Sequence, residues 1–210
     1  MYEELIEKQE EIRKKVLLID NFRTPIRVIG GVDQAFIDDV VISCIVVCEY
    51  KTFEIKEVTY SKMKVKFPYI PGFLAFREGP VIAKTWKKLK SKPDILLVDG
   101  NGILHPRMAG LASHIGVLLN VATIGVAKSL LCGKVKNGKV YIDEKQVGFE
   151  LVTKKGCKPI YVSPGHKVSI KTSVEIVKSC LKGYKLPEPL RLAHIYVNKI
   201  KKLKLMNVFI

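Results

Sequence analysis

Acidic residues are scarce in this sequence of 210 residues. Only 20 aspartates and glutamates stand against 36 lysines and arginines, so the formal net charge is +16. Long apolar runs are also absent, because the longest, Val40 to Cys48, contains a serine and falls well short of the roughly 20 residues of a membrane helix. The chain opens with glutamates such as Glu3 and Glu4 rather than with a basic and then apolar stretch. We therefore expect a cytoplasmic protein with no secretory signal and no membrane segment.

Cysteine is limited to five residues, an odd number with no spacing typical of a metal site. We expect all five to be reduced and structural, as in a reducing compartment. Cys44 and Cys48 lie four residues apart in a strand-like run, so they share one face and are expected to pack in the core.

The excess of lysine has two explanations. A polyanionic partner is one, and nucleic acid is the commonest such partner. A lysine-rich surface with few asparagines and glutamines is also typical of proteins from hot environments. Such proteins balance lysine with glutamate, whereas here lysine outnumbers all acids together, so nucleic acid is favoured.

Periodicity predicts strands first and then strands alternating with helices. Strands are expected over residues 28–36, 40–49, 52–67, 95–98, 121–126 and 160–163, with a hairpin over 133–152 turning at Asn137-Gly138. Helices are expected over 3–19, 77–90, 106–119, 127–131 and 169–182, and from Pro187 onward. This order predicts a single α/β domain over 1–210, with a mixed sheet of three antiparallel strands followed by parallel strands, flanked by helices.

Three acids lie in apolar surroundings. Asp33 follows Gly-Gly-Val, Asp99 follows Ile-Leu-Leu-Val, and Glu78 follows a stretch rich in apolar residues. A buried carboxylate must be paired or bind a cation. If the strands of Asp33 and Asp99 are adjacent and parallel, their carboxylates can converge on one Mg²⁺ or Mn²⁺ ion. The alternative is that each aspartate merely caps the turn after its strand.

Three further side chains could join this chemistry. His194 shares a helix face with Leu190 and Val197, and on spacing alone a core histidine is the commoner explanation. His105 precedes a predicted helix near Asp99. Lys128 follows a strand and could reach a phosphate, although it could equally be an ordinary surface lysine.

A stiff turn follows the third strand. Pro68, Tyr69, Ile70 and Pro71 form an aromatic and aliphatic tip after a strand with Lys62, Lys64 and Lys66 on one face. Such a tip can act as a wedge at a base step while lysines hold phosphates. A buried turn is the alternative.

Four segments together resemble the endonuclease V family, which repairs deoxyinosine. They are Gly31-Val32-Asp33, Pro68 to Glu78 (PYIPGFLAFRE), Leu97 to Arg107 (LVDGNGILHPR) and Thr123 to Ser129 (TIGVAKS). Later segments, Gly165-His166 and Arg191 to His194, are similar to that family too, and the likeness extends over residues 5 to 200, as in archaeal and bacterial members.

The resemblance implies a ribonuclease-H-like fold and a DNA repair endonuclease. Such an enzyme recognises deaminated bases and hydrolyses the second phosphodiester bond 3′ to the lesion, leaving 3′-hydroxyl and 5′-phosphate ends. A water activated by Mg²⁺, with Mn²⁺ as a substitute, performs the attack. The partner would be DNA containing deaminated bases, and inosine-containing RNA is an alternative substrate. A non-catalytic binder of damaged nucleic acid is a second alternative.

The resemblance also implies roles for particular residues. Asp33, Glu78 and Asp99 would bind the metal, with His194 near the reacting phosphate and Lys128 stabilising charge or positioning the water. Tyr69 would fill the gap left by the flipped base. The base pocket would include Gly72, Gly100, Gly102 and His105. Asn101 and Pro164 depart from residues common in the family, which concerns the pocket rather than the acids.

Overall fold

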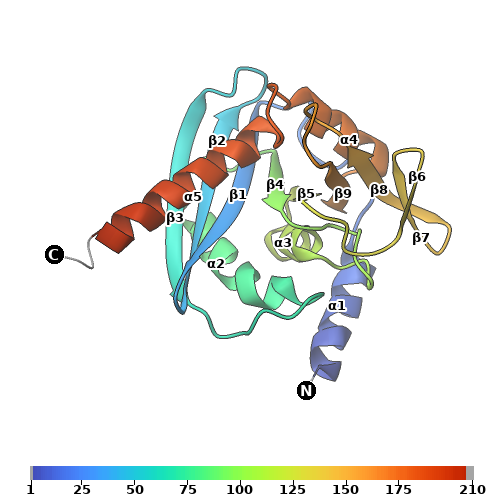
Figure 1. Ribbon diagram of the computed structural model, residues 1–210, viewed down its shortest axis with the longest axis horizontal. Coiled ribbons are helices and arrows are strands. Elements are labelled where there is room, and N and C mark those ends of the chain that lie inside the picture. The colour runs from blue at the N-terminus through green and yellow to red at the C-terminus, as the bar shows by residue number, and fades with distance from the viewer. Residues whose placement is uncertain (1, 207–210) are drawn as a thin grey trace.

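The computed structural model of the protein describes residues 2–206, and all nine of its strands join one mixed sheet in the order β3-β2-β1-β4-β5-β9-β8-β7-β6 (Figure 1). The strands are β1 (Val28–Ile37), β2 (Val40–Glu49), β3 (Ile55–Lys64), β4 (Ile95–Asp99), β5 (Ala122–Ala127), β6 (Lys134–Lys136), β7 (Lys139–Ile142), β8 (Lys145–Leu151) and β9 (Ile160–His166). The helices are α1 (Glu3–Lys15), α2 (Leu74–Lys88), α3 (Leu111–Leu119), α4 (Ile170–Ser179) and α5 (Glu188–Met206). The ends of the predicted domain, residue 1 and residues 207–210, lie outside the described residues.

The predicted strand order is confirmed. β1, β2 and β3 are antiparallel neighbours, and β4 then pairs with β1 in parallel, followed by β5 in parallel with β4. Val32 of β1 lies opposite Val98 of β4, so the aspartate that follows each valine reaches the same place in the sheet. The condition for the two aspartates to converge is therefore met.

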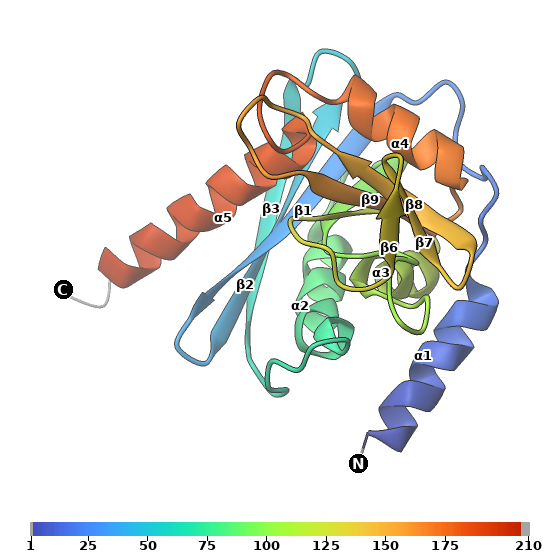
Figure 2. The same ribbon diagram turned by 45° about the vertical axis from the view of Figure 1, so that its right-hand side comes forward.

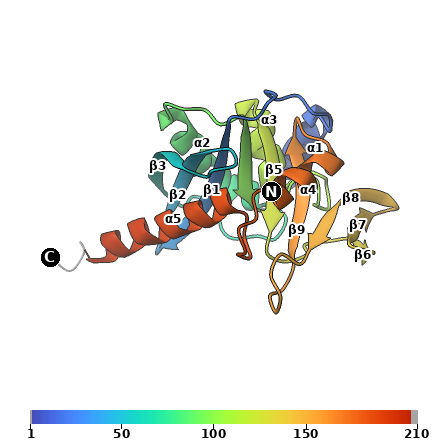
Figure 3. The same cartoon turned by 90° about the horizontal axis from the view of Figure 1, so that it is seen from above.

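Helices cover both faces of the sheet. α2 and α3 pack on one face, through residues such as Ile82 and Ile115, against Val32 and Val98. α4 and α5 cover the other face, where Leu190 joins a core that includes Cys44 and Cys48, as expected for the two cysteines. Figure 3 shows α2 and α3 on the opposite side of the sheet from α5. All five cysteines are free.

The helix after the Pro68–Pro71 turn begins earlier than predicted, at Leu74 rather than residue 77. Aromatic contacts hold its first turn, because the ring of Phe76 packs 6.1 Å from both Phe67 and Phe73. The Phe76 amide also donates to the Phe73 carbonyl at 3.0 Å. Glu78 consequently lies on the second turn of α2.

Two helix predictions were wrong. Residues 106–110 are not helical and α3 begins at Leu111, because the segment folds back and the Gly110 amide donates to the Gly102 carbonyl at 3.0 Å. No helix forms over residues 127–131. There β5 continues to Ala127, paired with Tyr161 of β9, and the chain then bends toward β6.

The segment predicted as one hairpin contains three strands and two turns. Asn137-Gly138 forms the first turn as expected, and Asp143-Glu144 forms a second, with φ of 44° and 63°. The positive φ values suit two-residue hairpin turns, and Asp is a residue type that tolerates them. Figure 2 shows β6, β7 and β8 gathered at one end of the sheet, which the strand order places opposite β3. Across residues 2–206, no helix combines the length and apolar character needed to cross a membrane.

Candidate functional site

Three carboxylates line one cleft of about 270 Å³. Asp33 comes from the middle of β1, Asp99 ends β4, and Glu78 projects from α2, which packs over the same strands. The parallel register of β1 and β4 places the two aspartates side by side. The cleft is lined by Asp33, Gln34, Tyr69, Leu74, Glu78, Asp99, Lys128 and His194.

Burial and neighbouring acids raise the pKa of two of the three carboxyl groups, Glu78 and Asp99. Burial, and then the charges of Asp99 and Asp33, raise the pKa of Glu78 to about 8. Burial and the charge of Asp33 raise the pKa of Asp99 to about 6. Full ionisation of this cluster at neutral pH therefore requires additional positive charge nearby.

One side chain supplies part of that charge. Lys128, just beyond the end of β5, forms an ion pair with Oδ2 of Asp99. Burial lowers the pKa of Lys128, but the neighbouring acids, Asp99 above all, outweigh burial and raise it. The alternative of an ordinary surface lysine is thereby excluded for Lys128.

His194 is not a core histidine, although Leu190 and Val197 beside it are fully buried. Its side chain is 48% exposed, and its Nδ1 lies 2.6 Å from Oδ2 of Asp33. The other oxygen of Asp33 accepts from the Gln34 amide at 2.8 Å. Asn198, one turn further along α5, donates to the His194 carbonyl at 2.8 Å. The first turns of α5 thus bring a histidine to the acid cluster.

The donor set fits a hard divalent cation. Carboxylate oxygens are the ligands that Mg²⁺ and Mn²⁺ prefer, and a buried cluster of acids gains most from such an ion. Within residues 2–206, no three His, Cys, Asp or Glu side chains already stand together as a ready-made metal cluster. Lys128 and His194 instead contact the aspartates directly.

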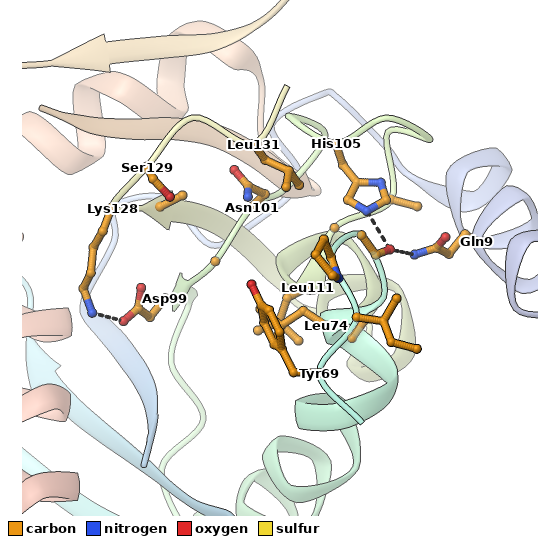
Figure 4. A pocket seen from close by; sticks show the side chains of 18 residues that line it. Gln9, Tyr69, Leu74, Asp99, Asn101, His105, Leu111, Lys128, Ser129 and Leu131 are labelled. Carbon is orange, nitrogen blue, oxygen red and sulfur yellow. Dashed lines mark hydrogen bonds and ion pairs between the residues drawn. The ribbon is translucent and has the colours of Figure 1, made fainter. Parts of the chain in front are cut away.

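A second hollow, of about 200 Å³, adjoins the acid cleft, and Figure 4 shows the side chains around it. Tyr69, Leu74, Asp99 and Lys128 line both spaces. Tyr69 is 68% exposed, so the Pro68–Pro71 turn is not a buried turn. An aromatic tip therefore stands at the boundary between the acid cleft and the adjoining pocket.

Three of the four predicted pocket residues line this second hollow. Gly72, Gly100 and His105 do so, whereas Gly102 does not. Gly102 is buried against β9, where a Cβ would lie only 2.1 Å from the Pro164 carbonyl oxygen. Its amide donates to Ser163 Oγ at 2.9 Å. The glycine at this position permits close packing of the loop on β9 rather than access to a ligand.

Sequence reasoning missed Gln9 and Arg107. Gln9 of α1 lines the pocket, and Arg107 contacts both Gln9 and the Gly72 carbonyl. Gln9 occupies the otherwise apolar face of the first helix, between Ile6 and Ile12. A single amide in such a stripe is a signal of a buried polar contact.

Lysines of β3 and α2 meet at the outer edge of the sheet, where Lys62 and Lys64 point to the face covered by α5 and α2 packs on the opposite face. Lys62, Lys64 and Lys66 are exposed, as expected from their alternation along and after β3. From α2, Lys84 Nζ donates to the Lys62 carbonyl at 3.3 Å and Lys88 Nζ to the Tyr60 carbonyl at 3.1 Å. The lysines of α2 thus reach the backbone of the edge strand β3, and the chain between the two elements contains the Tyr69 turn.

Comparison with known proteins agrees with this geometry. A family model described as endonuclease V matches residues 10–195. The endonuclease V of Dictyoglomus thermophilum is 48% identical over 94% of this chain and 90% of its own. The crystal structure of the Bacillus subtilis enzyme superposes with a TM-score of 0.90 and 31% identity, covering 99% of this chain and 94% of that one.

A third similar protein was crystallised with nucleic acid. Endonuclease V of Ciona intestinalis, in complex with a 24mer DNA containing an inosine followed by a ribo-adenosine, has a TM-score of 0.86 and 32% identity. The match covers 95% of this chain and 98% of that one. With an acid cleft, an adjoining pocket and matches over nearly all of its length, the chain belongs to the endonuclease V family.

Proposed function

We propose that this protein cleaves DNA at deaminated bases, with hypoxanthine as the base recognised. The continuity of the acid cleft with the pocket carries this proposal, because Tyr69, Asp99 and Lys128 line both. A base held in the pocket would bring the phosphates of its own strand to the carboxylates. Hydrolysis at the second phosphodiester bond 3′ to the lesion would leave 3′-hydroxyl and 5′-phosphate ends.

The pocket suits a base that has left the helix. Enzymes that act on a base extrude it, and a weakly paired base such as hypoxanthine costs least to extrude. The exposed ring of Tyr69 would take the vacated place in the stack, held by the prolines on either side of the turn. The lysines of α2 and β3 would bind the phosphates of the flanking duplex.

The residues of the acid cleft would divide the hydrolysis between them. Asp33, Glu78 and Asp99 would hold Mg²⁺, or Mn²⁺ in its place, which supplies an activated water and neutralises charge on the leaving oxygen. Lys128, paired with Asp99, would place its ammonium beside the phosphate oxygens. His194, anchored on Asp33, would orient its exposed ring edge toward the reacting phosphate.

The direct test is cleavage of a duplex containing a single inosine, with and without Mg²⁺. We expect a cut at the second bond 3′ to the inosine only when the ion is present, and no cut in the matched duplex with adenine. Protein that binds the inosine duplex and leaves it intact with Mg²⁺ would instead be a non-catalytic binder.

Inosine in RNA is a second candidate substrate. The nucleic acid bound to the Ciona intestinalis relative carries a ribonucleotide directly after the inosine, which favours this possibility for the family. Cleavage rates on matched DNA and RNA oligonucleotides with one inosine each would separate the two substrates. A faster rate on RNA would make the protein an endoribonuclease.

A further inference from the structure

Three side chains from outside the Pro68–Pro71 turn hold the carbonyl oxygen of Gly72, the residue that follows it. Gln9 Nε2 donates to this oxygen at 2.8 Å and Arg107 Nη2 at 3.0 Å. His105 Nε2 lies 2.9 Å away. A carbonyl oxygen has two lone pairs, so three donors use its full accepting capacity. The orientation of this peptide in the pocket wall is therefore set by side chains from α1 and from the loop after β4.

The side-chain amide of Gln9 links the Gly72 carbonyl to Arg107. While Nε2 donates to Gly72, Oε1 accepts from Nε of Arg107. If the amide were rotated by half a turn, its N–H groups would point at the guanidinium and its oxygen at a carbonyl. Only the first placement of Oε1 and Nε2 is therefore favourable. Gln9 is almost completely buried, which makes the loss of either bond costly.

Arg107 is held by neutral groups. Its guanidinium lies over the Phe73 ring, 4.7 Å from the centroid, and bonds to Gln9 and to the Gly72 carbonyl. Over residues 2–206, no carboxylate forms an ion pair with it. Its position consequently depends on Gln9 rather than on an acid.

His105 is held in the neutral form. Its Nδ1 accepts from the Arg107 amide at 3.2 Å, which leaves the proton on Nε2 for the Gly72 carbonyl. Burial, and to a smaller extent the charge of Arg107, lower the pKa of His105 to about 4. The ring is thus a fixed donor at neutral pH.

We propose that Gln9 is a positioning residue for the damaged base: through Arg107 and the Gly72 carbonyl, it fixes the pocket wall that distinguishes hypoxanthine from adenine. This inference rests on the proposed function. Residues 70–73 belong to no helix or strand, so the peptide groups of this stretch lack the support that a sheet or helix gives. When backbone groups recognise a base, their selectivity depends on how firmly the peptide groups are held in place.

The substitution Gln9→Glu separates positioning from folding. The introduced carboxylate keeps the length of the side chain and can pair with Arg107, so we expect the variant to fold, with a melting temperature lowered by no more than the loss of one buried hydrogen bond. Its oxygen would however face the Gly72 carbonyl and repel it. We expect KM for an inosine duplex to rise about tenfold, as for the loss of one buried hydrogen bond, with kcat and the affinity for undamaged duplex unchanged.

Gln146→Glu is the matched control, because it makes the same charge change on β8, where the Gln146 amide donates to the nearby Gly148 carbonyl. Gln9→Met is a second variant that removes both bonds, and it decides the matter if Gln9→Glu does not fold. KM values for both Gln9 variants within twofold of the Gln146→Glu value would overturn the inference. Equal losses on inosine and undamaged duplexes would overturn it as well. A parent protein without preference for inosine would instead refute the proposed function and, with it, this role of Gln9.

Discussion

We expect Asp99 to contribute to cleavage more than to DNA binding, because it lines the acid cleft and carries no positive charge for a phosphate. We expect Asp99→Ala to slow cleavage of an inosine duplex by about a hundredfold or more. The affinity for the same duplex, measured by fluorescence anisotropy, should remain within a few fold of the parent. Cleavage at the parental rate would rule out a role for Asp99 in binding the metal.

For Tyr69 we expect the reverse, a loss of DNA affinity that exceeds the loss of cleavage rate. Its ring is exposed, so we expect it to contribute only when it stacks on a base. Tyr69→Ala should weaken binding to inosine DNA by about 1–3 kcal/mol, the usual value of one aromatic–base stack. Single-turnover cleavage of the saturated complex should change less than the affinity. Equal affinities of variant and parent would contradict the wedge.

His105 makes the folded state sensitive to acid. Its pKa is lowered from 6.5 to about 4 on folding, so the unfolded chain binds a proton there first as the pH falls. The stability that His105 contributes is therefore complete above about pH 6.5 and is lost progressively toward pH 4. His105→Gln keeps a donor for Gly72 without a titrating ring.

The unfolding free energy of His105→Gln should consequently fall less than that of the parent between pH 7 and pH 4.5. Urea unfolding at a series of pH values measures this difference. Above pH 7 the two profiles should run parallel, which serves as the internal control. Parallel profiles over the whole range would show that the histidine is not kept neutral by the fold.

At the scale of elements, close packing of α5 on β1 brings His194 to Asp33. A Cβ on Gly31 would lie 2.2 Å from the Pro189 carbonyl oxygen, at the start of α5. Gly31→Ala must displace that helix, so we expect a loss of about 2 kcal/mol or more in the free energy of unfolding. Cleavage should fall too, because His194 moves with the helix.

Gly79→Ala is a suitable control for stability. The nearest atom to its Cβ would be 3.9 Å away, in ordinary contact, and alanine favours a helix. Thermal unfolding of the two variants should therefore shift in opposite directions. A parental melting temperature for Gly31→Ala would contradict the tight packing of α5 on β1.

The sequence predicted the strands better than the loops. Alternation and apolar runs located β1, β2 and β4, and hence Asp33 and Asp99, because these strands are fixed by burial within the sheet. The segment after β4 was predicted as helix from Pro106, but its backbone bonds run to Gly102 and Asn101 instead. Contacts between distant segments decide such loops, and no local pattern records them. Gln9, which meets Gly72 across 63 positions, was missed for the same reason.

At the scale of the whole molecule, the lysines of α2 and β3 account for part of the charge of +16. If Lys62 and Lys84 contact phosphates, neutralising each should lower the slope of log affinity against log salt by about one. Lys62→Gln and Lys84→Gln should show this reduction with any DNA sequence, damaged or not. Titrations of fluorescent duplex at several salt concentrations measure the slope.

Lys154→Gln is the matched control, since Lys154 is exposed in the loop between β8 and β9. Its slope should equal that of the parent. A uniform reduction for all three variants would mean that the charge acts diffusely over the surface. The lysine excess would then have a cause other than a defined phosphate-binding surface.

The parallel pairing of β1 with β4 has a consequence for how activity arises during folding. Between the two strands lie β2, β3 and α2, so Asp33 and Asp99 approach each other only after a large loop has closed. The β1–β2 and β2–β3 hairpins are local and can form sooner. A chain that has made only these hairpins has not yet brought the two aspartates together. Any cleavage that depends on both aspartates would therefore arise only with the complete fold.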